Sequence, residues 1–168
     1  MTNLDYVEYL LPEVVEEADL RWMNLKMAVD YDKLSTKLKS ELISNILEAS
    51  FERVADDIQA PLSDDMADLV VRGENLEIKT AKTTRVWRGG EYSKRESEYV
   101  LVSYDDSGDS LDWFFIYTYL TEDDWKSSKS GNYYATTIDL DYVLDNCPHK
   151  ILCGTVEKKR ILRHLICE

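Results

Sequence analysis

Apolar residues in the first third of the chain recur at every third or fourth position, which is the spacing that lines one side of an α-helix. Two segments show it, about residues 13–29 and about residues 33–59. Pro61 is expected to end the second helix, because the residue before a proline avoids helical dihedral angles. The positions that carry the pattern are Val14, Val15, Ala18, Trp22, Leu25 and Val29, then Leu34, Leu38, Leu42, Ile46, Phe51, Val54 and Ile58.

The period changes to two after residue 67. Residues 68–72 are short and rich in β-branched side chains, and residues 76–80 alternate between apolar and polar. Gly73 opens the turn signal between them, so the pattern predicts a β-hairpin. A register with Asp68 opposite Lys79 would place both side chains on one face, and a slip of one residue would separate them.

The rest of the chain predicts further strands and helices. Residues 98–104 and 111–120 are strand-like and are joined by a polar turn, whereas residues 81–97 are polar and contain Gly89 and Gly90, which predicts a loop. The sequence thus predicts one α/β (α+β) domain over residues 1–168, with a mixed central β-sheet flanked by helices. Three further elements are expected: a short helix with a Thr121–Asp124 capping box, a strand at about 150–156 and a helix at about 157–167.

Length and composition are those of an ordinary globular domain. The 168 residues suffice for one hydrophobic core. No apolar run reaches the ~18 residues of a membrane helix, and the N-terminal residues carry acids where a secretory signal carries lysine or arginine. We therefore expect a cytoplasmic protein without membrane contact. Paired zinc-ligand spacings are missing, which favours buried or idle cysteine thiols over a zinc site. The residues concerned are Cys147, His149, Cys153, His164 and Cys167.

The charge is strongly negative but uneven. The net charge is −13, yet residues 71–95 hold 7 bases against 3 acids, and residues 146–168 hold 5 bases against 2 acids. Nucleic-acid binding depends on lysine and arginine. An acidic body with two basic stretches is compatible with DNA binding if the stretches meet in space.

Asp68, Glu77 and Lys79 carry the candidate chemistry. Hydrolysis of a phosphodiester bond requires carboxylates that bind Mg²⁺, an activated water and positive charge for the transition state. Lys79 lies two residues after Glu77 in a predicted strand and therefore points to the same face. The backbone carbonyl of Ile78 is a further candidate metal ligand.

This arrangement resembles the PD-(D/E)XK nuclease superfamily, which includes most type II restriction endonucleases. The resemblance covers residues 33–120, with Ala67 where the family name has proline. It implies a restriction-endonuclease-like fold and a site-specific deoxyribonuclease that cuts double-stranded DNA with Mg²⁺, for which Mn²⁺ can substitute, and with no small-molecule cofactor. Cutting two strands with one site per chain favours a homodimer. Residues 1–32 then form a candidate dimer interface, and residues 121–168 complete the sheet.

An acidic residue on the first core helix often assists in this family. Glu48 and Glu52 are the candidates, on a helix face that also includes Glu41 and Asn45. An exposed helix face without function is the alternative for this stripe.

The segment after Lys79 is the candidate DNA-binding element. It mixes bases with hydroxyls, glycines and aromatics, which suits phosphates and guanine edges; a flexible basic loop is the alternative. The candidate contacts are Lys82, Arg85, Arg88, Tyr92, Ser93, Lys94 and Arg95.

Three other interpretations stay open. The Asp68, Glu77 and Lys79 set is also compatible with a solvated strand face that carries a cross-strand ion pair. A nuclease of this kind could instead be structure-specific, such as a Holliday junction resolvase. The net charge is compatible with a non-catalytic interaction protein that retains the fold and binds a basic partner.

Overall fold

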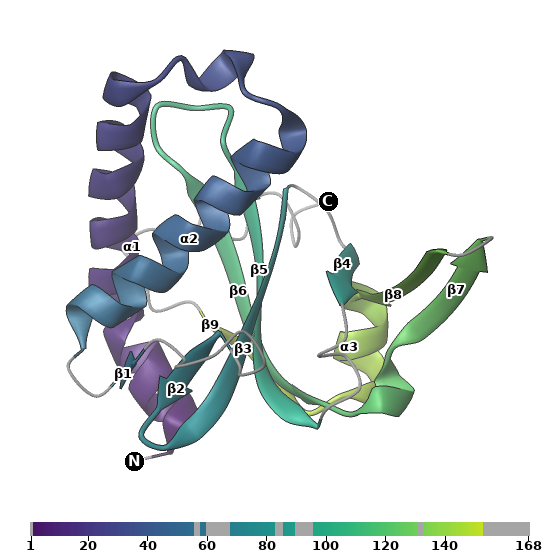
Figure 1. The fold of residues 1–168 in the computed structure, drawn as a ribbon. Helices are drawn as coiled ribbons and strands as arrows, with labels where there is room; N and C mark the ends of the chain where they lie inside the picture. Colours follow the sequence, from purple (N-terminus) through teal and green to yellow (C-terminus); the bar gives the residue numbers. More distant parts are fainter. Residues whose placement is uncertain are drawn as a thin grey trace.

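A six-stranded β-sheet lies between two layers (Figure 1). Two long helices cover one face, and a small second sheet with a short helix covers the other. This is the mixed α+β architecture that the sequence predicts. The computed structural model describes residues 2–55, 58–59, 68–82, 86–89, 96–130 and 133–152.

The helical layer consists of α1 (Asn3–Ala28) and α2 (Thr36–Val54), joined through a 3-10 turn, η1 (Tyr31–Lys33). Both predicted helices exist, but their bounds differ: α1 begins ten residues before the expected start at residue 13, and α2 ends at Val54, well before Pro61. Residues 58–59, expected at the end of the second helix, form a strand instead. Thr2 explains the earlier start, because it forms a capping box with Asp5. None of the helices in the described part of the chain is long and apolar enough to cross a membrane.

The central sheet is mixed, because β3 runs parallel to β5 while the other neighbours are antiparallel. Its order is β1-β2-β3-β5-β6-β9. The strands are β1 (Ile58–Gln59), β2 (Leu69–Val71), β3 (Glu74–Lys82), β5 (Ser97–Asp105), β6 (Asp112–Leu120) and β9 (His149–Leu152).

The predicted hairpin exists, but its register differs from the expected one. Val71 pairs with Glu74, so the turn consists of Arg72 and Gly73, which have φ values of 54° and 84°. A two-residue hairpin turn of this type needs positive φ at both positions. The prediction of Asp68 opposite Lys79 was therefore wrong by two residues. A shift of two preserves the face of every side chain, so Asp68 keeps the expected side.

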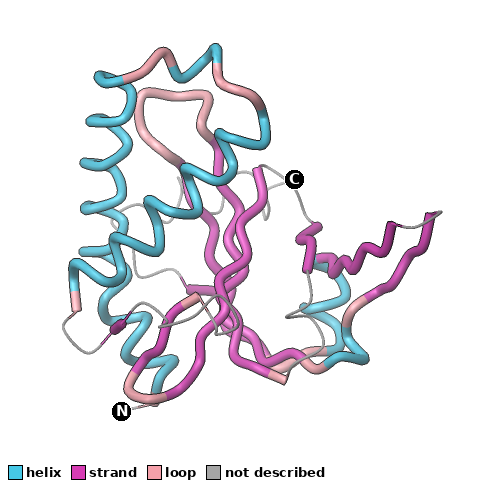
Figure 2. The backbone as a smooth tube through the Cα atoms, in the orientation of Figure 1, coloured by secondary structure: helices cyan, strands magenta, loops and turns pink. Residues whose placement is uncertain are grey.

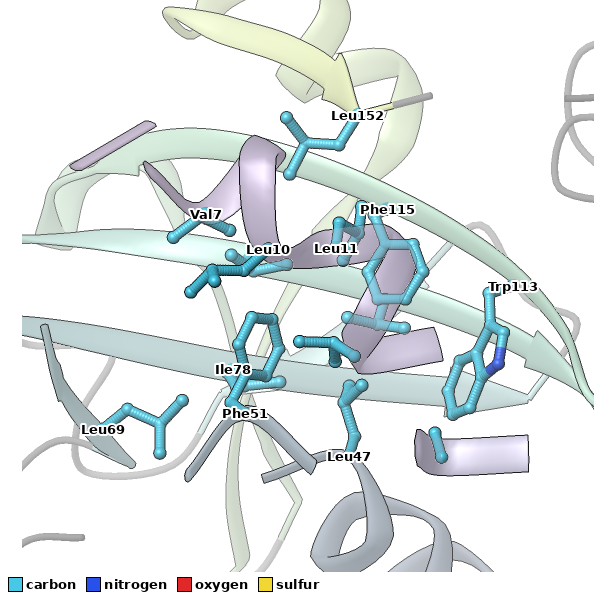
Figure 3. Packing of buried hydrophobic residues seen from close by; sticks show 14 of the residues in the cluster. Val7, Leu10, Leu11, Leu47, Phe51, Leu69, Ile78, Trp113, Phe115 and Leu152 are labelled. Atoms are coloured by element: carbon cyan, nitrogen blue, oxygen red, sulfur yellow. The ribbon is translucent and has the colours of Figure 1, made fainter. Parts of the chain in front are cut away.

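Strands β5 and β6 are buried on both faces, which explains their nearly continuous apolar sequence. One set of alternate residues, including Trp113 and Phe115, packs against the helical layer, where Leu47 and Phe51 of α2 belong to the same cluster (Figure 3). The other set, including Phe114 and Ile116, packs against the second sheet. The sheet is thus the common wall of two hydrophobic cores.

The second sheet corrects one expectation. Residues 81–97 were predicted as a loop, yet residues 86–89 form a strand whose Trp87 is fully buried and donates its indole N–H to the carbonyl of Val102 at 2.9 Å. Figure 1 shows the hairpin of this sheet extending away from the helical layer. The sheet has the order β4-β8-β7, and its elements are β4 (Val86–Gly89), β7 (Lys126–Ser130), β8 (Tyr133–Asp139) and the following α3 (Leu140–Asn146).

The end of the chain is described only in part. The capping box of Thr121 and Asp124 is confirmed and begins η3 (Glu122–Asp124). Strand β9 confirms the start of the strand expected at about 150–156, and Cys147 is a buried free thiol. The expected helix at 157–167, with Cys153, His164 and Cys167, lies outside the described residues.

Candidate active site

The candidate site lies where β3 passes beyond its pairing with β2. Strand β2 pairs with Glu74, Asn75 and Leu76, whereas β3 continues to Lys82 with β5 on its other side. Asp68 comes directly before β2 and accepts a hydrogen bond from the backbone N–H of Ile78 at 2.8 Å. Its carboxylate therefore meets β3 just past the last residue that pairs with β2, at an edge of the sheet.

Glu77 and Lys79 share one face of β3 and are in contact. The ammonium of Lys79 donates to Glu77 at 3.1 Å and lies 3.8 Å from the carboxylate of Asp68. The Lys79 side chain is only 18% exposed and that of Glu77 only 3%. The structure thus brings the three predicted residues together in a largely buried cluster, rather than on a solvated strand face.

Glu48 reaches the same cluster from α2. This helix packs on the opposite face of β3, where the hydroxyls of Ser44 and Thr80 are hydrogen-bonded. One turn further along, Glu48 is half-buried and interacts electrostatically with Asp68, Lys79 and Glu77. Glu52, the second candidate on this helix, is exposed. Of the two glutamates, Glu48 is the one within the electrostatic reach of the cluster.

The cluster holds more negative charge than its lysine offsets. Burial raises the pKa of Glu48 to about 7, and Asp68 adds to this shift while Lys79 opposes it. Burial likewise raises the pKa of Glu77 to about 7, against the influence of Lys79. When Asp68, Glu77 and Glu48 are ionised, three negative charges face the positive charge of Lys79 among the residues that the structure describes. The excess of two is the charge of one divalent cation.

The donor set fits Mg²⁺ rather than a softer metal. Mg²⁺ prefers oxygen ligands and is usually held by one or two carboxylates together with water and substrate phosphates. Asp68 and Glu77 supply the carboxylates. The amide and carbonyl of one strand residue point to the same side, so the carbonyl of Ile78 faces the Asp68 edge as its N–H does. Among the described residues, no group of three or more acidic, histidine or cysteine side chains lies close enough together to hold a metal ion, so a Mg²⁺ ion here would depend on the carbonyl, water and substrate phosphates for its other ligands.

The predicted DNA-binding residues are described only in part. Arg88 is an exposed residue of β4, on the face opposite Trp87. The ammonium of Lys82 is held at 2.8 Å by Asp106, whose carboxylate also accepts a hydrogen bond from Tyr31 at 2.6 Å. The other candidates, Arg85, Tyr92, Ser93, Lys94 and Arg95, lie outside the described residues.

Sequence reasoning missed two residues that shape this region. Tyr99 pairs with Glu77 across the parallel β3–β5 ladder and is fully buried beside it. Burial is the main cause that raises the pKa of Tyr99, and the charge of Glu77 raises this pKa further. The pairing of β3 with β5 would have indicated this neighbour. Asp106 lay in a stretch interpreted as a turn between strands, where nothing local indicates that it joins Lys82 to Tyr31.

Comparison with known proteins does not assign the chain to a family. No model of a known protein family matches the chain, and no curated protein matches it. The functional argument therefore depends on the arrangement of the residues themselves.

Proposed function

We propose that the chain is a Mg²⁺-dependent DNA endonuclease of the PD-(D/E)XK type. The observation that carries the proposal is the convergence of Asp68, Glu77 and Lys79 at the open edge of β3, with Lys79 3.1 Å and 3.8 Å from the two carboxylates. A structural ion pair needs one acid and one base. This cluster adds Glu48 as a third acid and leaves the charge unbalanced, which favours a cation site.

Each residue has a role in this mechanism. Asp68, Glu77 and the carbonyl of Ile78 would hold Mg²⁺, which supplies positive charge and a water of lowered pKa. Lys79 orients the attacking water and offsets the charge that develops on the phosphate. Glu48, with a pKa of about 7, can accept a proton from that water near neutral pH.

Double-stranded DNA is the proposed substrate, cut at a short specific sequence by a homodimer. A basic segment follows the cluster in the chain and continues into β4, whose Arg88 is exposed, whereas Lys82 is held by Asp106. Because the described part of the chain contains one such cluster, two chains related by a two-fold axis would be needed to cut both strands of a palindrome. This is the activity of a type II restriction endonuclease.

The test is incubation with plasmid DNA and Mg²⁺. Discrete fragments are expected, and sequencing of their ends identifies the cut site. Cutting confined to four-way junctions would indicate a junction resolvase instead of a restriction endonuclease. Intact DNA with both Mg²⁺ and Mn²⁺ would overturn the nuclease proposal, and would favour an acidic interaction protein that uses its net charge of −13 to bind a basic partner.

A further inference from the structure

A polar hollow of about 330 Å³ lies between α2 and β3, beside the candidate active site. It is lined by Ser40, Glu41, Ser44 and Asn45 from the helix and by Thr80 from the strand. Four of these five side chains are neutral and carry hydroxyl or amide groups. The proposed chemistry of the active site does not use any of these five residues.

Short side chains explain why the hollow exists. Ile43 and Leu47 are fully buried and fix α2 on the sheet, while Ser44 contacts Thr80 through a hydroxyl pair. Small residues at this contact leave unfilled space along the seam between helix and strand. Asn45 is exposed at its mouth. The hollow is therefore open to a ligand from solvent and lined by polar groups, of which Ser44 and Thr80 bond each other and Ser40 bonds the hydroxyl of Tyr104.

The hollow lies beside the candidate active site along α2. Glu48 lies one helical turn after Ser44 and Asn45, and it interacts electrostatically with Asp68 and Lys79. A DNA strand whose scissile phosphate lies at the cluster can therefore pass the hollow close to the bond that is cut.

We propose that this hollow binds the sugar-phosphate backbone of the DNA strand that is cut, close to the scissile bond. The inference rests on the proposed nuclease function and deepens it. Side chains of serine, threonine and asparagine are common donors to phosphate and sugar oxygens in DNA complexes. These neutral donors would contact the sugar-phosphate backbone of DNA, so recognition of the base sequence would depend on other elements of the protein.

Glu41 is the one group of the hollow that opposes a phosphate. Its carboxylate is 56% exposed and lies 3.9 Å from the ammonium of Lys37, which is 87% exposed. This pair is solvated and weak, so Lys37 can turn toward a bound phosphate. The repulsion from Glu41 then limits the affinity for DNA without excluding the backbone from the hollow.

The test reverses the charge at Asn45. Asn45→Lys and Asn45→Asp are compared with Asn24→Lys and Asn24→Asp, which make the same changes at an exposed position of α1 outside the hollow. All four are made in the Lys79→Ala background, so that the labelled duplex stays uncut. Affinity is measured by fluorescence anisotropy over a range of NaCl concentrations, and folding by thermal denaturation.

Asn45→Lys is expected to tighten binding several-fold and to steepen the dependence of log K on log salt by about 0.9, the value for one added phosphate contact. Asn45→Asp is expected to weaken binding by a similar factor, and the Asn24 pair to change neither quantity. Equal effects at the two positions, or none at Asn45, would overturn the backbone site while DNA cutting by the unmodified protein stands. Failure of the unmodified protein to cut or bind DNA would overturn the proposed function, and the backbone site with it.

Discussion

Two lysines of β3, three residues apart, are placed in opposite electrostatic surroundings. The ammonium of Lys82 bonds the carboxylate of Asp106, which also accepts a hydrogen bond from Tyr31, and Asp105 adds a weaker electrostatic influence. Burial alone would raise the pKa of Asp106, but the bonds from Lys82 and Tyr31 outweigh it and leave that pKa lowered. Lys79 faces Asp68 and Glu77 within 4 Å, and the pKa of Glu77 is raised instead of lowered.

This difference in surroundings distinguishes an ion pair that stabilises the fold, at Lys82, from a cluster that could bind a cation, at Lys79. In the Lys82 cluster the ammonium bonds a carboxylate that also binds Tyr31, and these bonds tie the turn after β5 to η1. Figure 2 shows this turn at the same end of the molecule as the junction between α1 and α2. The Lys79 cluster retains surplus negative charge at an edge of the sheet. A buried surplus of this kind destabilises the fold, so its presence is better explained by function than by stability.

Loss of Lys79 is expected to have the largest effect. Lys79→Ala removes the positive charge that faces the reacting phosphate, and removal of one such group typically lowers kcat by about 10²–10³-fold. DNA binding should change little, because the contacts along the backbone remain. Plasmid cleavage and anisotropy, measured on the same preparation, separate the two effects.

Lys82→Ala is the matched control for this change. It removes a lysine from the same strand and is expected to lower stability while kcat stays near that of the unmodified protein. If Lys82→Ala abolished turnover and Lys79→Ala did not, the assignment of the two clusters would be reversed.

Neutralising one acid in each cluster should change stability in opposite directions. In Asp106→Asn one of two hydrogen bonds at a buried carboxylate is lost, which should cost about 1–3 kcal/mol. Glu77→Gln removes a surplus charge and should raise the free energy of unfolding of metal-free protein near pH 8. Since one pKa unit corresponds to about 1.4 kcal/mol, this gain is of the order of 1–3 kcal/mol. Urea denaturation in a chelator measures both, and a loss of stability in Glu77→Gln would contradict the surplus of charge.

The stability of metal-free protein should also depend on pH. Glu48 and Glu77 have raised pKa values, about 7 against the ordinary 4.5, so the folded chain binds more protons than the unfolded chain between these limits. The free energy of unfolding therefore falls as the pH rises from about 5 to about 8. Asp106 contributes little over this range, because its lowered pKa leaves it ionised throughout.

Mg²⁺ is expected to flatten this pH dependence, because a bound cation stabilises the ionised carboxylates. Thermal denaturation across the same pH range, with Mg²⁺ and with chelator, measures the effect. The double variant Glu48→Gln with Glu77→Gln should lack both the slope and the response to Mg²⁺. A pH slope that persisted in the double variant would assign it to other groups.

The sequence predicted the site better than it predicted the surroundings of the site. Alternation in β3 placed Glu77 and Lys79 on one face, and a hairpin error of two residues did not move Asp68 to the other side. Because side-chain facing depends only on parity, it survives an error in the turn. The cross-strand partners do change with an error in the turn. The φ values of Arg72 and Gly73 in the structure were needed to assign those partners.

Trp87 shows what sequence patterns could not provide. It stands among basic and polar residues, so its segment was predicted as a loop. Its burial depends on long-range partners, namely Ile138 across the β4–β8 ladder and the carbonyl of Val102. No local period encodes such contacts. Asp106 was missed for the same reason, since its partner Tyr31 is 75 residues away.

The smallest expected effect concerns Glu41, at the edge of the hollow. Glu41→Gln removes the negative charge nearest to the proposed backbone site and should tighten DNA binding by a few-fold at low salt, because an exposed charge contributes less than about 1 kcal/mol. Glu16→Gln, an exposed glutamate of α1, makes the same change in net charge away from the hollow. Anisotropy at low and high salt separates the two variants. An equal gain in both would show that net charge, rather than the position of Glu41, limits the affinity for DNA.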